Sequence, residues 1–96
     1  MTDKFLKDLE LVIEEAAEVI QAATKIQRFG IDDNYPTYFD CISNVDALTN
    51  EIGQLLHCID RLKLDPQIIE NSKLVKEEKL KEFGPEGTYL KDRDGK

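Results

Sequence analysis

The sequence predicts an all-α fold, a helical bundle that is completed by dimerisation. Three runs place apolar residues three and four positions apart, which is the spacing of one face of a helix. The five glycines and three prolines cluster outside most of these runs, where connections are expected. The 96 residues are 41% hydrophobic, so they make one small domain with a thin core. We expect a helical domain over residues 1–83 and an irregular, charged tail over residues 84–96.

The first predicted helix spans residues 3–29. Thr2 or Asp3 can cap its start, and Gly30 is a favourable stop after the last turn. Its apolar residues form two stripes, and such a wide apolar arc indicates contact with more than one neighbouring helix. The first stripe is Phe5, Leu9, Val12, Ala16, Val19, Ala23 and Ile26, and the second is Leu6, Ile13, Ala17 and Ile20.

Residues 31–42 contain Asp, Asn and Pro and are expected to form a connecting loop. Ser43 followed by Asp46 resembles a capping box and begins the second helix. Gly53 lies inside this helix, where glycine costs about 1 kcal/mol relative to alanine. We therefore expect a close helix–helix approach at Gly53. The apolar set of the helix is Val45, Leu48, Ile52, Leu55, Leu56, Ile59 and Leu62.

The third helix is expected over residues 66–82, because Asp65 and Pro66 end one helix and begin the next. One of its faces is dense in Lys and Glu. The first two helices are long and broadly apolar, and one copy of them makes a poor core. Pairing with a second copy would complete a four-helix bundle, so we expect a homodimer or a dimer of dimers.

Charge and composition exclude several kinds of partner. The formal net charge of −7 and the pI near 4.6 argue against binding to nucleic acid or to an anionic membrane. No apolar run approaches the ~18 residues of a membrane span, and no signal-peptide core is present. Cys41 and Cys58 lack the spacing of a zinc site or a disulfide framework. We expect a soluble, cytoplasmic protein.

The acidic stretch EEAAE at residues 14–18 interrupts the first apolar run. Glu14, Glu15 and Glu18 fall within roughly 100° of arc on one helix face. Like charges at this spacing repel each other by a few tenths of a kcal/mol unless a cation lies between them. Oxygen-rich clusters suit Mg²⁺ or Mn²⁺, and Glu51 on the second helix could face the first three. The alternative is a solvated acidic face without a ligand.

The ordered motifs resemble those of the MazG-like family of all-α nucleoside triphosphate pyrophosphohydrolases. They are EEAAE at residues 14–18, NEIGQ at residues 50–54 and NSKLVK at residues 71–76. The family carries EExxE on one helix, ExxD on the next and an NxK-type basic motif further on. The resemblance covers roughly residues 10–80 and is greatest to the short, single-domain members.

The resemblance implies hydrolysis of a (d)NTP to a nucleoside monophosphate and pyrophosphate. Glu15, Glu18 and Glu51 would hold Mg²⁺, or Mn²⁺, against the triphosphate and position a water for attack at the α-phosphorus. Glu14 would hold a second ion or act as base. The residues implied to contact the nucleotide are Lys25, Asn71, Lys73 and Lys76.

One position departs from the family pattern. Gln54 stands where the fourth metal-binding acid is expected, and an amide oxygen coordinates without supplying charge. Asp60 is half a helical turn out of phase with Glu51 and cannot replace it. Two readings follow: a weakened or differently metallated enzyme, and a module that binds nucleotide or a protein without cleavage. His57 and Cys58 are read as packing or surface residues, and the base preference is not encoded in these motifs.

Overall fold

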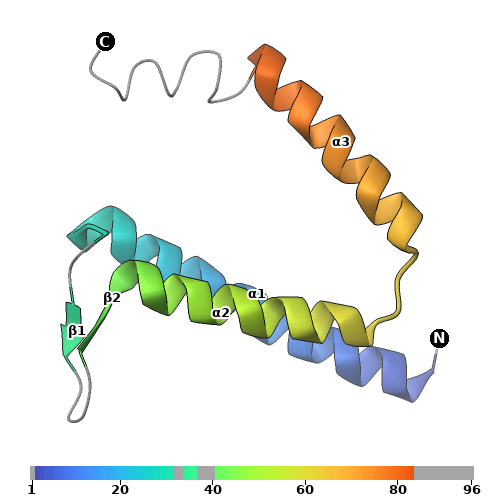
Figure 1. Cartoon of the computed structure of the whole chain (residues 1–96). Helices are drawn as coiled ribbons and strands as arrows, with labels where there is room; N and C mark the ends of the chain where they lie inside the picture. The colour runs from blue at the N-terminus through green and yellow to red at the C-terminus, as the bar shows by residue number, and fades with distance from the viewer. Residues whose placement is uncertain (1, 32–33, 37–40, 84–96) are drawn as a thin grey trace. The chain divides into compact units, whose positions relative to one another are not determined.

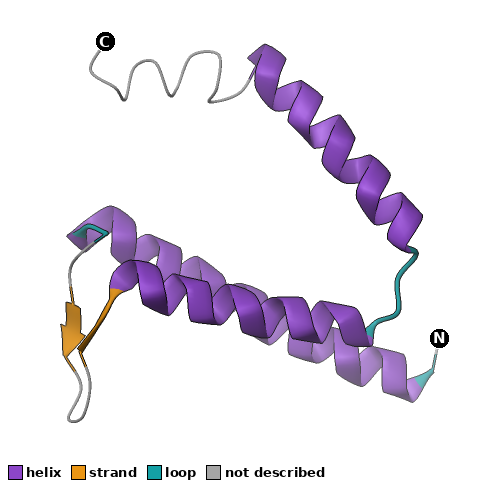
Figure 2. Ribbon diagram, viewed as in Figure 1, coloured by secondary structure: helices purple, strands orange, loops and turns teal. Residues whose placement is uncertain are grey.

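A computed structural model of the chain describes residues 2–31, 34–36 and 41–83. This part contains three helices and one short two-stranded ladder (Figure 1, Figure 2). The helices confirm the all-α class. The chain divides into two compact units, residues 1–63 and 64–96. The expected domain boundary after residue 83 stays a prediction, and the tail over residues 84–96 lies outside the described residues.

Helix α1 (Asp3–Phe29) has the bounds that the sequence predicts. The Thr2 hydroxyl accepts a hydrogen bond from the Phe5 N–H at 3.1 Å and caps the first turn. At the other end Gly30 has φ 99°, and its N–H donates to the Ile26 carbonyl at 2.8 Å. A side chain at this φ would be strained, so glycine is the residue that lets the chain leave the helix here.

The segment after α1 is not wholly irregular, and the loop prediction for residues 31–42 is wrong in part. Strands β1 (Asn34–Pro36) and β2 (Cys41–Ser43) pair in antiparallel register, with Tyr35 opposite Ile42. Aromatic and β-branched residues favour extended backbone. Proline is tolerated in a strand when its missing N–H falls on an open edge. The breakers that predicted a loop are therefore compatible with this short hairpin.

Helix α2 (Asn44–Arg61) begins where the capping pattern places it. The Ser43 hydroxyl accepts a hydrogen bond from the Asp46 N–H at 3.2 Å. The helix ends at Arg61 with Leu62 as its C-cap, and the next residue, Lys63, has φ 55°. This left-handed conformation is common after a helix, but glycine usually occupies it.

Helices α1 and α2 lie side by side and antiparallel (Figure 1). At one end the Asn44 side-chain amide donates to the Gly30 carbonyl at 3.0 Å. At the other end Arg61 contacts Asp8. Ala22 is the one buried apolar residue among the described residues, and none of them has a side chain below 2% exposure. The thin core expected from the chain length is confirmed.

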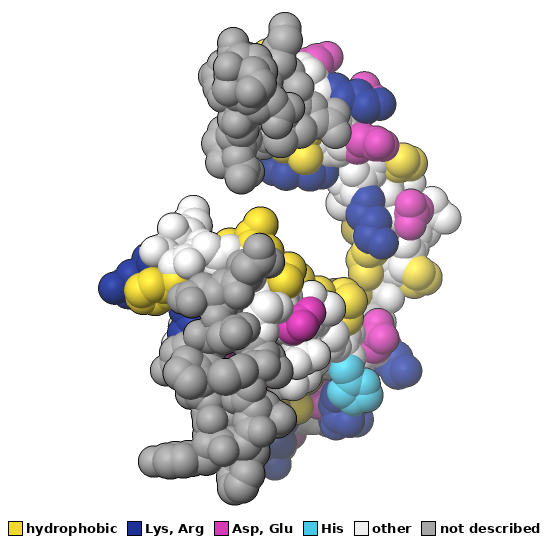
Figure 3. Space-filling model, turned by 60° about the vertical axis from the view of Figure 1, so that its left-hand side comes forward, with side chains coloured by type: hydrophobic (Ala, Val, Ile, Leu, Met, Phe, Trp, Pro, Cys, Tyr) yellow, Lys and Arg dark blue, Asp and Glu magenta, His cyan; other side chains and the backbone are white. Residues whose placement is uncertain are grey.

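Part of the apolar surface of this helix pair is uncovered within the first unit. The second predicted stripe of α1 is exposed, with Ile13 at 61% and Ile20 at 66%. Because the two helices run antiparallel, helical geometry puts this stripe and one flank of α2 on the same side of the pair. We call the resulting surface the apolar face, and Figure 3 shows hydrophobic side chains at the molecular surface. Its exposed residues are Leu6, Ile13, Ile20, Val45, Ile52 and Leu56.

Helix α3 (Pro66–Phe83) starts at the predicted proline. The Asp65 carboxylate accepts a hydrogen bond from the Gln67 N–H at 2.8 Å, which confirms the stop-and-restart signal. Within its unit the helix leaves Ile68, Val75 and Phe83 exposed. No helix in the described ranges combines the length and the apolar character needed to cross a bilayer.

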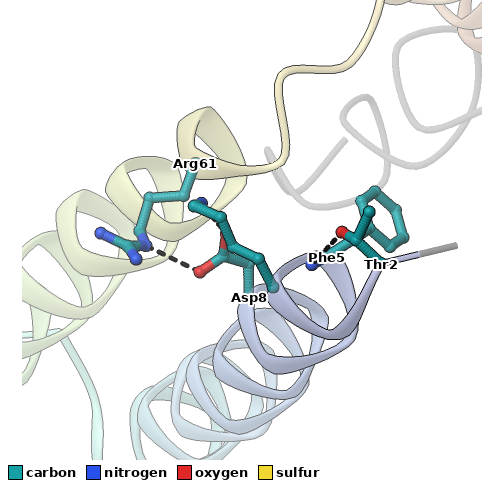
Figure 4. Close-up of polar contacts among 5 residues, drawn as sticks. Thr2, Phe5, Asp8 and Arg61 are labelled. Carbon is teal, nitrogen blue, oxygen red and sulfur yellow. Dashed lines mark hydrogen bonds and ion pairs between the residues drawn. The ribbon is translucent and has the colours of Figure 1, made fainter.

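A buried acid joins the two helices at one end of the pair. Asp8 is only 3% exposed. Its carboxylate accepts a hydrogen bond from Lys4 at 2.6 Å and one from Arg61 at 2.9 Å (Figure 4). Charge-assisted bonds of this kind are stronger than neutral ones. Sequence reading missed this residue, although its position between Phe5 and Val12 puts it on the inward face of α1.

The triad of Lys4, Asp8 and Arg61 predicts that the stability of the helix pair falls at acidic pH. The hydrogen bond from Lys4, together with that from Arg61, lowers the pKa of the Asp8 carboxyl below its ordinary value of 3.8, against the opposing effect of desolvation. The stabilisation is therefore complete above pH 3.8 and is lost as pH falls through the lowered pKa. We expect Asp8→Asn to lower the urea midpoint at about pH 6, and the difference from the parent chain should shrink as the pH falls below 3.8. A constant difference across this range would contradict the assignment.

Candidate functional site

The three acids of EEAAE occupy different surroundings on α1. Glu14 and Glu18 are exposed, whereas Glu15 is half-buried against α2. Glu15 shares the inward face of α1 with Asp8 and Ala22, because these residues are seven positions apart along the helix. Glu15 therefore lies inside the helix pair, Glu18 at its edge and Glu14 in solvent.

Glu18 and Glu51 line the same small cavity between α1 and α2. Its volume is about 100 Å³, and Lys25 also contributes to its wall. We call it the acidic cavity. The structure thus brings together three of the predicted site residues, two carboxylates and one ammonium, from two helices. The other lining residues are Gln21, Ala22, Asn44 and Ala47.

Glu15 and Gln54 line a neighbouring, more open groove of about 500 Å³. We call it the amide groove, because Asn50 and Gln54 supply side-chain amides to it. Gly53 also lies on its wall, and a Cβ added there would meet nothing within 4 Å. The close helix–helix approach expected at Gly53 is therefore wrong, because α1 packs on a different face of α2. The remaining lining residues are Thr49, His57 and Cys58.

Two carboxylate oxygens at these sites are buried without a hydrogen-bond partner. They are the Oε2 atoms of Glu15 and Glu51. A buried polar atom without a partner costs about 1–3 kcal/mol, and native proteins rarely keep such atoms without a reason. The two atoms come from different helices, Glu15 from α1 and Glu51 from α2.

The donor set suits a hard divalent cation, since carboxylate and amide oxygens are its usual ligands. Among the described residues, however, no three His, Cys, Asp or Glu side chains form a ready metal-binding group. Glu18 is exposed, so its side chain can turn toward Glu51 without disturbing the helix pair. Glu15, Glu51 and Gln54 would supply the other oxygens. The oxygen types suit Mg²⁺ or Mn²⁺, and the two unpaired atoms belong to residues that line two neighbouring hollows, Glu15 at the amide groove and Glu51 at the acidic cavity.

The predicted nucleotide contacts of α3 belong to the second unit. Asn71, Lys73 and Lys76 are all exposed. The Asn71 amide oxygen accepts a hydrogen bond from Gln67 at 3.1 Å. Asn71 and Lys73 lie about 160° apart around the helix axis, so they face different directions. Lys73 and Lys76 are about 60° apart and can contact the same anion.

His57 and Cys58 border the amide groove. His57 is exposed, and Cys58 is half-buried with a free thiol. The expected packing role of Cys58 agrees with its burial, and His57 takes the surface position. The sequence reading did not connect either residue with the groove that contains Glu15.

Comparisons of the chain with family models, with curated proteins and with solved structures found no match. The geometry above and the ordered motifs of the sequence are therefore the basis for a functional assignment.

Proposed function

We propose that the protein is a Mg²⁺-dependent nucleoside triphosphate pyrophosphohydrolase that converts a (d)NTP to a (d)NMP and pyrophosphate. The observation that carries the proposal is the pair of unpartnered carboxylate oxygens of Glu15 and Glu51, contributed by two facing helices. Buried anions without partners are stabilised by a bound cation, and a divalent cation in turn attracts a polyphosphate. The MazG-like order of motifs supports the same chemistry, in a protein acting in the cytoplasm.

Each of the predicted site residues has its own proposed role in the reaction. Glu15, Glu18, Glu51 and the amide oxygen of Gln54 would hold the Mg²⁺, or Mn²⁺, which neutralises phosphate charge when bound. Lys25 lies beside Glu18 and Glu51 and would contact a phosphate. The resemblance also implies nucleotide contacts from Asn71, Lys73 and Lys76, which belong to α3 of the second unit.

The proposed chemical step is a single displacement. A water oxygen bonds to the α-phosphorus, and the bond from that phosphorus to the oxygen bridging to the β-phosphate breaks. The proton of the attacking water passes to solvent, and the resemblance gives the exposed Glu14 the role of base for this water or of ligand to a second ion. Pyrophosphate leaves with the bridging oxygen. Positioning and electrostatic stabilisation account for most of the rate enhancement in phosphoryl transfer of this type.

The test is a pyrophosphate-release screen of the full chain over all canonical and several modified nucleotides. Each nucleotide is assayed with Mg²⁺, with Mn²⁺ and with excess chelator. We expect release from at least one nucleotide with one of the metals, and none with chelator. The absence of release from every nucleotide with both metals would reject the hydrolase proposal.

Gln54 supports a second candidate, a nucleotide-binding or protein-interaction module without catalysis. This residue lies on the wall of the amide groove with Glu15 and supplies no charge there. If the missing charge limits metal binding, Gln54→Asp should raise Mg²⁺ affinity about tenfold or more, because a charged contact replaces a neutral one. Calorimetric titration with Mg²⁺ measures the change. If the protein is a hydrolase, the parent chain should already release pyrophosphate. If it is a non-catalytic module, pyrophosphate release should occur only in Gln54→Asp or in neither protein.

We also propose that two copies of the chain pair through the apolar face, as a homodimer or a dimer of dimers. The exposed side chains of Leu6, Ile13 and Ile20 on α1 continue onto Ile52 and Leu56 of α2. A contiguous apolar surface of this extent on a small unit marks a contact with another element. The thin core of the first unit makes such a contact necessary for stability. A bundle of four helices would bury this surface.

A further inference from the structure

A basic pocket lies at the end of the helix pair where α1 begins and α2 ends. It is lined by Lys4, His57, Asp60, Arg61 and Lys63 and has a volume of about 390 Å³. All five residues belong to the first unit. Three cations at one end of a chain whose net charge is −7 are unusual, and the proposed chemistry of the acidic cavity does not use them.

Two of these cations are held in place by a buried anchor. Lys4 and Arg61 both bind the carboxylate of Asp8, whose side chain is 4% exposed. One carboxylate balances only one of the two charges, so the triad carries a surplus positive charge. Arg61 uses its Nε for this bond, and Figure 4 shows its terminal amino groups directed away from Asp8. These groups are donors in a fixed geometry that suits phosphate oxygens.

The third cation is placed by an unfavourable backbone conformation. Lys63 has φ 55° and is the one non-glycine residue with positive φ among the described residues. A lysine after a helix interacts well with the helix dipole, but this effect does not require the left-handed backbone. Glycine would adopt the conformation without the steric penalty. This position usually holds glycine, yet here it holds a lysine that lines the pocket.

We propose that the basic pocket binds a soluble polyphosphate anion. Lys4, Arg61 and Lys63 supply the charge, and His57 can donate a further hydrogen bond. The positive end of the α1 dipole and the negative end of the α2 dipole both lie at this end of the pair and offset each other, so the side-chain charges decide the attraction. Asp60 opposes binding, so the pocket favours a ligand with several negative charges over a single carboxylate. The strongly acidic protein as a whole disfavours an anionic membrane surface, which leaves a free anion as the ligand.

His57 lines both the basic pocket and the amide groove, so the two sites adjoin. The anion site is independent of the hydrolase proposal, because it involves no metal ligand and no bond cleavage. A protein that binds polyphosphate here and hydrolyses no nucleotide would still satisfy it.

The test is a calorimetric titration of inorganic triphosphate into the full chain in metal-free buffer at low salt. We expect binding that Lys63→Gly weakens about tenfold, the usual effect of removing one charge-assisted contact. Glycine relieves the positive φ, so this variant should unfold at a higher temperature, and weaker binding cannot be attributed to unfolding. Asp60→Asn should bind triphosphate more tightly than the parent chain.

Lys79→Ala is the matched control, because it removes the same charge from the exposed surface of α3. It should leave the affinity for triphosphate unchanged. The proposal is overturned if the parent chain does not bind triphosphate, or if Lys63→Gly binds as well as the parent. It is also overturned if Lys79→Ala weakens binding equally. Co-sedimentation with vesicles containing phosphatidic acid, without binding of inorganic triphosphate, would instead assign the pocket to a lipid surface.

Discussion

Replacement of Glu51 by methionine is expected to abolish pyrophosphate release and, at the same time, to stabilise the metal-free protein. Removal of one charged group that acts on the transferring phosphate usually costs about 10²–10³ in rate. The stabilisation follows from the unpartnered Oε2 of Glu51. Methionine has a similar length and no oxygen, so the cost of burying that atom, about 1 kcal/mol or more, disappears.

The two measurements together separate a functional acid from a structural one. Thermal unfolding in metal-free buffer should give a higher midpoint for Glu51→Met than for the parent chain. Added Mg²⁺ should then raise the midpoint of the parent only, because a ligand stabilises the state that binds it. A loss of activity accompanied by a loss of stability would mean that Glu51 supports the fold instead of holding a cation.

Glu10→Met is the matched control for this experiment. Glu10 lies on the same helix as the EEAAE motif and is exposed, so its substitution should change stability by less than about 0.5 kcal/mol. It should leave the rate of pyrophosphate release and the effect of Mg²⁺ unchanged. Glu15→Met should behave like Glu51→Met, because the Glu15 Oε2 is also buried without a partner.

Helix boundaries could be predicted from the sequence because they are set by local chemistry. The hydroxyls of Thr2 and Ser43 and the carboxylate of Asp65 cap the helices that follow them. Gly30 ends the first helix through its own positive φ. Each signal acts within three residues of the chain and needs no knowledge of distant contacts.

Features that depend on the pairing of helices could not be predicted in the same way. The apolar pattern of α2 does not specify which face meets α1, so Gly53 was expected at a contact and lies on an open groove. Asp8 was overlooked because an acid on an inward stripe was not expected to have a partner, and one of its two partners, Arg61, is distant in the sequence. The short hairpin of β1 and β2 likewise depends on a pairing between residues that are far apart in the loop.

The candidate site contains one feature that local sequence predicts and one that depends on how the helices pair. Helical spacing places Glu15 and Glu18 on one side of α1, and the structure puts Glu18 with Glu51 and Lys25 at one cavity. The spacing alone does not predict that Glu15 lies inward, in a separate groove beside Gln54. That difference arises because adjacent positions of one helix face reach different residues of the neighbouring helix.

An acidic residue in the apolar face should have a large effect if two copies of the chain pair there. Ile20 is 66% exposed in the first unit, and a substitution on a free surface changes stability by less than about 0.5 kcal/mol. In a dimer interface the same change buries an unpaired charge and costs about 3 kcal/mol or more. The size of the effect of Ile20→Glu therefore reports whether this face is covered.

The measurements are molar mass by light scattering and thermal unfolding over a range of protein concentrations. The parent chain should have at least twice the mass of the 11.0 kDa monomer, and its midpoint should rise with concentration. Ile20→Glu should be monomeric or unfolded, whereas Gln21→Glu should remain associated, since it adds the same charge on the side of the acidic cavity. A parent chain that is monomeric at all concentrations would show that no second copy covers this face. In that case, pairing of two copies could not be what compensates for the thin core of the helix pair.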